Sequence, residues 1–144
     1  MTSLRVAAVQ ASYVLMDQAA TLDRVAALTG QAAAQGAQLA DFPEVFIPGT
    51  PIWIDTRPIW DGDEDWFRLL AENAVVVPGP ATGRLGAIAR DNGLWLVIGV
   101  EEREQHGGTI YIFRLHVDTS ARPAFVEHSS ATEPGTSPAA SPGD

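Results

Sequence analysis

Two residue types that carry much of enzyme chemistry are absent from the chain, which contains no cysteine and no lysine. The lack of cysteine excludes a disulfide framework and a thiolate metal site. It also removes the thiol, and the lack of lysine removes the ammonium group, that a catalytic carboxylate commonly serves. Arginine supplies all nine basic residues. No apolar run approaches the roughly 20 residues that a membrane-spanning helix needs.

Positive charge is scarce as well, since the chain has a net charge of −9 and a pI of about 4.6. Binding to nucleic acid or to an anionic membrane requires clustered Lys and Arg, so this balance argues against both partners. The 144 residues correspond to one domain. The first residues lead into a strand-like run without a long apolar segment, so we expect no signal peptide and a cytoplasmic protein.

Hydrophobic patterning predicts an α/β architecture in which strands alternate with helices. Helical spacing of apolar residues begins after Asp17, a good N-cap, and stops at Gly36. A second helix is predicted over 81–92, with Gly93 as its stop. The continuous apolar run over 94–100 is typical of a strand buried on both faces. The other predicted strands are 4–9, 38–42, 74–77 and 109–117.

A long loop from Pro48 to Trp60 interrupts this alternation, because its three prolines rule out regular structure through most of it. The loop also contains Trp53 and Trp60, and two tryptophans indicate that it packs over another part of the protein. Asp63 is predicted to cap a short helix after the loop.

The composition changes after about residue 128. The segment 129–144 contains no Leu, Ile, Val or aromatic residue. Such a segment buries too little apolar surface to offset the entropy of ordering it, so we expect it to be disordered. The predicted organisation is therefore one α/β domain over 1–128 and a low-complexity tail over 129–144.

Glu44 follows a short apolar strand, and the carboxyl end of a buried strand is where α/β folds place reactive groups. Phe42 and Pro43 are expected to desolvate its carboxyl group in part and to raise its pKa toward neutrality, which suits a general base. The alternative is a structural role, in which Glu44 forms an ion pair or caps a backbone turn. The local sequence leaves both interpretations open.

Three segments of the chain carry a resemblance to a known family. They are Val6–Ala11, Phe42–Pro51 and Val97–Arg103, the last followed by Gly107–Tyr111. In this order they resemble the nitrilase, or carbon–nitrogen hydrolase, superfamily, and the nitrilase branch most closely. The resemblance runs without gross gaps from about residue 4 to residue 111, and it covers the N-terminal portion of the family only.

The resemblance implies a stacked α-β-β-α sandwich, here incomplete, and a Glu–Lys–Cys triad that hydrolyses nitriles or amides through a covalent intermediate. Only the glutamate maps onto this sequence, at Glu44. Thr50 and Trp53 fall on the loop that borders the substrate pocket in the family. We expect no cofactor and no metal, a small nitrile or amide as substrate, and a homo-oligomer. Because the Lys and Cys are absent, whether this chain is an enzyme stays open.

Other residue types offer no convincing nucleophile or metal site. Ser12, Thr50 and Ser129 are candidates by type only, because none lies in a nucleophile-elbow pattern. The three histidines have no ligand spacing. Glu101, Glu102 and Glu104 are interpreted as a solvated edge. The histidines are His106, His116 and His128.

Three hypotheses remain. The first is a shortened nitrilase-like protein that does not hydrolyse nitriles alone. The second is a non-catalytic binding module that uses a sheet face left exposed by the missing half of the sandwich, centred on the strand predicted over 94–100. The third is that a shifted reading frame or an early stop produced the residues after Tyr111.

Overall fold

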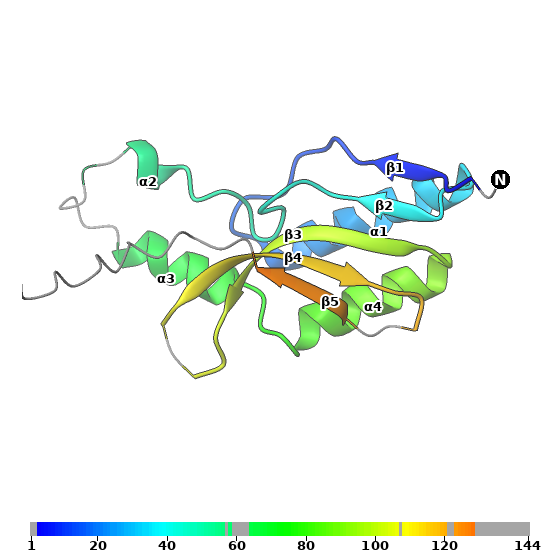
Figure 1. The fold of residues 1–144 in the computed structure, drawn as a ribbon. Coiled ribbons are helices and arrows are strands. Elements are labelled where there is room, and N and C mark those ends of the chain that lie inside the picture. The colour runs from blue at the N-terminus through cyan, green and yellow to red at the C-terminus, as the bar shows by residue number, and fades with distance from the viewer. Residues whose placement is uncertain (1–2, 57, 59–63, 107, 121–122, 129–144) are drawn as a thin grey trace, which may run out of the picture.

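In a computed structural model, the chain forms a five-stranded sheet with two long helices against it (Figure 1). The structure describes residues 3–56, 58, 64–106, 108–120 and 123–128. The strands lie in the order in which they occur along the chain. The elements are β1 (Val6–Ala8), α1 (Gln18–Ala34), β2 (Leu39–Asp41), α2 (Trp53–Thr56), α3 (Glu64–Asn73), α4 (Pro80–Asn92), β3 (Trp95–Arg103), β4 (Ile110–Val117) and β5 (Pro123–His128).

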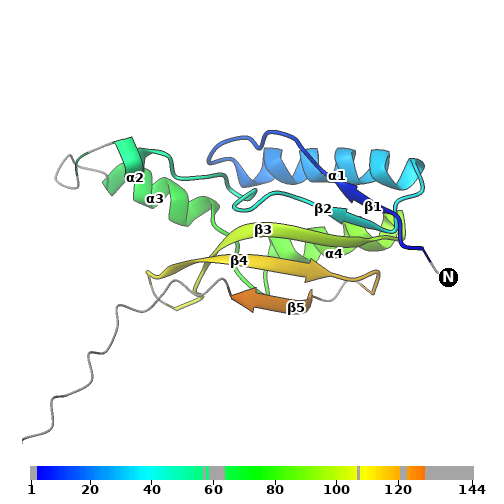
Figure 2. The same cartoon turned by 45° about the horizontal axis from the view of Figure 1, so that its top comes forward.

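The order of the strands explains why both long helices lie on one face. Strands β1, β2 and β3 are parallel neighbours, whereas β4 and β5 continue the sheet antiparallel. Crossovers between parallel strands are almost always right-handed, so two crossovers that step in the same direction place their helices on the same face. Helices α1 and α4 accordingly lie side by side against one face, and α2 and α3 extend beyond one end of the sheet (Figures 1 and 2).

The main hydrophobic core lies between this helix layer and the sheet. It joins Leu22 and Val25 of α1 and Leu85 of α4 to alternate residues of the strands. Because side chains alternate along a strand, each strand has one face toward this core and one face away from it. The strand residues in the core are Ala40, Leu96, Ile98, Val100, Phe113, Leu115 and Val117.

Both long helices begin and end where the sequence predicts. The Asp17 carboxylate accepts a hydrogen bond from the Ala20 N–H at 2.9 Å and caps α1. Helix α4 starts with Pro80 in its first turn and ends at Gly93, whose φ of 65° lies in the left-handed region. Local capping chemistry therefore sets the length of the helix layer.

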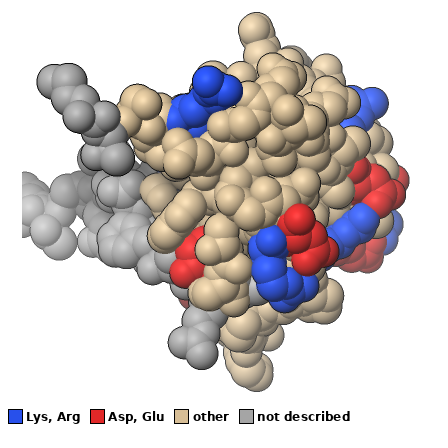
Figure 3. Space-filling view, turned by 90° about the vertical axis from the view of Figure 1, so that its right-hand side faces the viewer, with Lys and Arg blue, Asp and Glu red and all other residues tan. Residues whose placement is uncertain are grey.

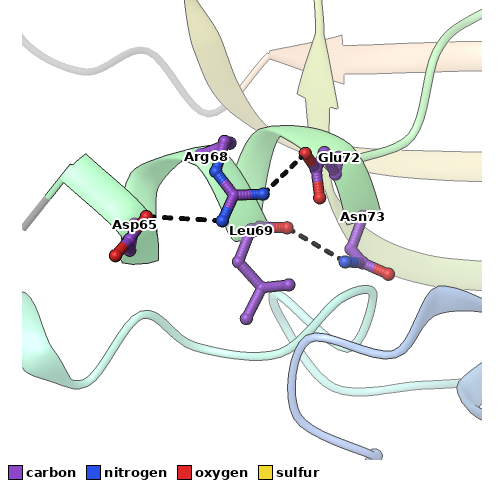
Figure 4. Close-up of polar contacts among 5 residues, drawn as sticks. All are labelled: Asp65, Arg68, Leu69, Glu72 and Asn73. Carbon is purple, nitrogen blue, oxygen red and sulfur yellow. Dashed lines mark hydrogen bonds and ion pairs between the residues drawn. The ribbon is translucent and has the colours of Figure 1, made fainter.

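Helix α3 is joined to the start of α1 by polar contacts and carries charges on its outer side. The Gln18 side chain donates to the carbonyl oxygens of Asn73 and Ala74, each at 3.0 Å. On the solvent side, Arg68 forms ion pairs with Asp65 at 3.3 Å and with Glu72 at 3.0 Å (Figure 4). Exposed pairs of this kind contribute little stability, so the contacts to α1 and the buried Leu70 fix the place of α3.

Several predictions need correction. Strand β3 continues to Arg103, so Glu101 and Glu102 belong to a strand and not to a solvated edge. The loop after Pro48 contains the short helix α2. No strand forms over 74–77, where Val75 makes an isolated bridge to Glu102. Trp60, Asp63, Ser129 and the tail, for which the sequence also made predictions, lie outside the described residues.

The α/β class and the single helix layer match one half of the predicted α-β-β-α arrangement. Neither long helix lies on the other face of the sheet (Figure 2), and within the described residues helix α3 meets that face only at one end, where Leu70 packs near Ile110 of β4. No helix in that part is both long and apolar enough to cross a membrane.

Candidate functional site

Glu44 lies in a tight turn that follows β2 and rests on β3. The Gly99 N–H donates to the Pro43 carbonyl at 3.2 Å, and the Phe46 N–H donates to the Gly99 carbonyl at 2.8 Å. The residue after Glu44, Val45, has a φ of 51°, a left-handed conformation that β-branched residues rarely adopt. Backbone conformations of this kind persist where the surrounding structure holds them, and they cluster at functional sites.

A glycine at position 99 is required for this arrangement. A Cβ atom at Gly99 would lie 2.5 Å from the Glu44 Cα, 2.5 Å from the Val45 nitrogen and 2.7 Å from the Pro43 oxygen. All three are backbone atoms, which cannot move aside as the end of a flexible side chain can. The absence of a side chain at Gly99 therefore allows the Glu44 turn to lie directly against the sheet.

The missing Cβ also shows on which face the turn lies. Ile98 and Val100 point into the helix-covered core, so Gly99 faces the opposite side. Glu44 thus lies over the sheet face that α1 and α4 leave uncovered. The residue is exposed, so the desolvation by Phe42 and Pro43 that we expected is not present in this chain. Among the described residues Glu44 forms no ion pair, and the predicted roles of this carboxylate stay predictions.

The two predicted substrate-loop residues differ in their surroundings. Thr50 is exposed. Trp53 is 4% exposed, and its ring stacks on that of Trp66 with the centroids 5.3 Å apart. It packs with Met16 and Leu70 in a second, smaller core. Packing therefore accounts for the burial of Trp53 in the described residues, and its contact with a substrate stays a prediction.

A pocket that the sequence analysis missed lies near this loop. It has a volume of about 350 Å³, and neither Glu44, Thr50 nor Trp53 lines it. Loop residues Pro51 and Ile54 form one part of its wall. The remaining lining residues are Phe67, Leu70, Glu101, Gly108, Ile110 and Ile112.

Among the described residues that line this pocket, Glu101 is the only carboxylate, and it is 3% exposed. Burial raises the pKa of Glu101 to about 7. Its Oε2 atom has no hydrogen-bond partner among the described residues. The alternation of side chains along a strand could have identified Glu101, because position 101 follows Gly99 by two residues and shares its face. The sequence analysis missed it because it ended the strand at Val100, whereas β3 continues to Arg103.

The remaining candidates do not gather into a site. Ser12 is exposed, and its carbonyl accepts a hydrogen bond from Arg24 at 2.9 Å. His106 lies in the β3–β4 connection, His116 on β4 and His128 at the end of β5. Throughout the described ranges, no three His, Asp or Glu residues are grouped so that they could hold a metal ion.

On the side of the molecule shown in Figure 3, charged side chains do not gather into a patch of one sign. Acidic and basic side chains alternate along one edge of that face, and most of the face carries neither. Charges of both signs that alternate do not make the continuous basic surface that phosphate backbones require.

Comparison with known proteins decides the family. The model of the carbon-nitrogen hydrolase family matches residues 5–127. The chain belongs to this family. The match continues past Tyr111, where the sequence analysis ended the resemblance, so the residues of β4 and most of β5 also follow the family pattern.

Nitrilases are among the relatives of this family member. An aliphatic nitrilase of Rhodococcus rhodochrous is 38% identical over 122 residues, which is 83% of this chain and 32% of that protein. A nitrilase of Bacillus sp. strain OxB-1 is 41% identical over 118 residues, which is 79% of this chain and 32% of that protein. The chain spans about a third of the length of these curated relatives.

The fold is also that of solved relatives. A crystal structure of an amidase from Nesterenkonia sp. superposes with a TM-score of 0.60 at 25% identity, covering 87% of this chain and 42% of the amidase. This carbon–nitrogen hydrolase chain therefore contains the nitrilase-like fold over its described residues and corresponds to the N-terminal part of the family domain.

Proposed function

We propose that this chain provides the glutamate part of a nitrilase-type site for hydrolysis of nitriles or amides, with Glu44 as the general base. The observation that carries the proposal is the Glu44 turn, which Gly99 holds against the uncovered face of β3 in a chain of the carbon-nitrogen hydrolase family. Thr50 is proposed to border the substrate, because it is exposed on the loop that follows Glu44. Trp53 is proposed to support that loop from beneath.

The chemistry requires two groups that this sequence does not contain. By resemblance to the family, the glutamate takes the proton of a cysteine thiol, and the thiolate adds to the nitrile or amide carbon. A lysine stabilises the charge that develops on the substrate, and water then releases the acid and ammonia. In a solved structure of a Glu-to-Gln mutant of the Nesterenkonia amidase, the acetamide moiety of fluoroacetamide is covalently attached to the active-site cysteine. Without cysteine, this chain cannot form that bond.

We therefore expect the purified chain to release no ammonia from nitriles or amides. Removal of a covalent nucleophile costs many orders of magnitude in rate, since the remaining groups supply only binding and orientation. The measurement is ammonia release over a panel of aliphatic and aromatic nitriles and amides, with and without a thiol-alkylating reagent.

The reagent and a variant separate the outcomes. Activity that alkylation abolishes comes from a contaminating enzyme, because the chain has no thiol. Turnover that Glu44→Gln abolishes and that alkylation leaves unchanged would show a cysteine-independent reaction and overturn the expectation of inactivity. Glu104→Gln, an exposed glutamate on the β3–β4 connection, is the matched control.

A second function is favoured by the uncovered sheet face. The row formed by Val6, Leu39 and Trp95 crosses three neighbouring strands on that face, and Trp95 is 44% exposed. Exposed apolar surfaces of this kind attract protein partners. The expected result is a dimer or a larger complex in size-exclusion chromatography with light scattering, and a monomer at all concentrations would exclude self-association.

A further inference from the structure

The pocket above Glu101, called the apolar cup below, has one acidic group among the described residues that line it. Its wall comes from three places: the loop around α2 with Pro51 and Ile54, helix α3 with Phe67 and Leu70, and the sheet. On the sheet, Ile112 is the register partner of Glu101, so both side chains share the uncovered face. Ligand sites are typically concave and mostly apolar with few polar groups, and this cup has that composition.

The charge of Glu101 has no partner within the described residues. Arg103 lies two residues along the same face of β3, and Arg68 lies on helix α3, which contributes to the wall of the cup. Arg68 is occupied by its ion pairs with Asp65 and Glu72. No ion pair joins Glu101 to either arginine in the part of the chain that the structure describes. A buried carboxylate without a partner is costly, so a ligand that supplies the missing positive charge gains that energy on binding.

The geometry points to a binding site for a small organic cation, in which a primary ammonium group pairs with Glu101 and an aryl or alkyl stem fills the apolar cup. The volume of about 350 Å³ lies at the lower end of small-molecule sites and suits a compact amine. An anion would be repelled by the carboxylate, and a neutral apolar molecule would leave it unpaired. Because Glu44 does not line the cup, the inference goes beyond the proposed hydrolytic role.

The ionisation of Glu101 is consistent with the binding of an ammonium group. With its pKa raised to about 7 by burial, Glu101 is ionised at pH 8, and an ammonium ligand would hold it ionised at lower pH as well. Binding at pH 6 should therefore release a proton from Glu101, whereas binding at pH 8 should not. The other charged groups that face this region are Arg68, Glu72, Arg103 and Arg114.

The test is a titration of the purified chain with benzylamine at pH 8, followed by two-dimensional NMR. The expected result is saturable binding with shifts at Glu101 and Ile112. Benzyl alcohol and phenylacetate, which have the same ring with a neutral or an anionic group, should bind at least tenfold more weakly. Equal binding of all three probes would show a purely apolar cup and overturn the proposal, as would the absence of saturable benzylamine binding.

Two variants test the two parts of the site. Glu101→Gln keeps the size of the side chain and should weaken benzylamine at least tenfold, whereas the exposed control Glu104→Gln should not change it. Phe67→Ser acts on a wall residue that is 48% exposed, and it should weaken benzylamine more than methylamine. Unchanged affinity for benzylamine in a folded Glu101→Gln protein would overturn the proposal. If that variant does not fold, an equal loss of affinity for benzylamine and methylamine in Phe67→Ser would overturn it instead. These binding measurements do not depend on ammonia release, so their outcome is independent of the activity test of Glu44.

Discussion

The two faces of β3 differ in the residues that they carry. On the helix-covered face, Leu96, Ile98 and Val100 are completely buried among α1 and α4. On the other face, the strand has no side chain at Gly99 and a buried carboxylate at Glu101. One strand therefore carries a uniform hydrophobic surface on one side and chemically exceptional residues on the other. In β-structure such an asymmetry separates the residues that stabilise the fold from those that position a site.

The contrast also distinguishes two carboxylates on the same side of the sheet. Glu44 is exposed and held by its backbone, whereas Glu101 is buried and held by the strand. Exposure leaves Glu44 accessible to a group from outside this chain. Burial gives Glu101 a raised pKa of about 7 and an unpaired oxygen. The sequence analysis expected Glu44 to be partly desolvated and Glu101 to be solvated, whereas in the structure Glu44 is exposed and Glu101 is buried.

The largest effect is expected on the helix-covered face. Leu96→Ala should lower the free energy of unfolding by about 3 kcal/mol, because it removes a fully buried side chain and leaves a cavity between α4 and the sheet. Urea denaturation followed by circular dichroism measures the change. Trp95→Leu, one residue earlier on the uncovered face, should cost no more than about 1 kcal/mol. Equal losses in the two variants would contradict the difference between the faces.

A smaller effect is expected where the Glu44 turn meets the sheet. Gly99→Ala should lower the free energy of unfolding by about 2 kcal/mol, since the new Cβ would overlap backbone atoms of Glu44 and Val45. The same variant should displace the turn and shift the NMR resonances of Glu44. Gly83→Ala is the matched control, because nothing lies within 4 Å of its Cβ position in helix α4. It should stabilise the protein by about 0.5 kcal/mol. Destabilisation by Gly83→Ala as large as that by Gly99→Ala would refute the role of close approach.

The smallest effect is a dependence of stability on pH through Glu101. Its pKa rises from 4.5 to about 7 on folding, so the folded protein binds the proton more tightly than the unfolded chain between these values. Stability from this group is complete below pH 4.5 and is lost as pH rises toward and through 7. Because the cup opens to solvent, we expect a loss of only about 1 kcal/mol between pH 5 and pH 8.

Glu101→Gln should remove this component of the pH dependence, because the amide does not ionise. The measurement is the difference in unfolding free energy between the original protein and the variant at pH 5 and pH 8. The unfolding free energy of the original protein minus that of the variant should be higher at pH 5 than at pH 8, and a difference that stays constant, or that is higher at pH 8, would contradict burial as the cause of the raised pKa.

Much of the fold could be predicted because the responsible signals are local. Asp17 and Gly93 mark helix ends through capping chemistry, and the apolar run before Val100 predicts a buried strand. The prediction failed at Glu101, since a charged residue was taken as the end of the strand. Whether such a residue is buried depends on what packs over it, here α3 and the α2 loop, and these contacts join parts of the chain that are far apart in sequence.

The amino-acid sequence by itself determined the α/β class, the family and the absence of the thiol and the ammonium group, because these follow from residue types and their order. The tertiary structure alone decided which face of the sheet receives the Glu44 turn, that Gly99 admits it, and that Glu101 is buried in an apolar cup. The physical reason is that close approach and desolvation depend on the neighbours brought together by folding, which no single segment specifies.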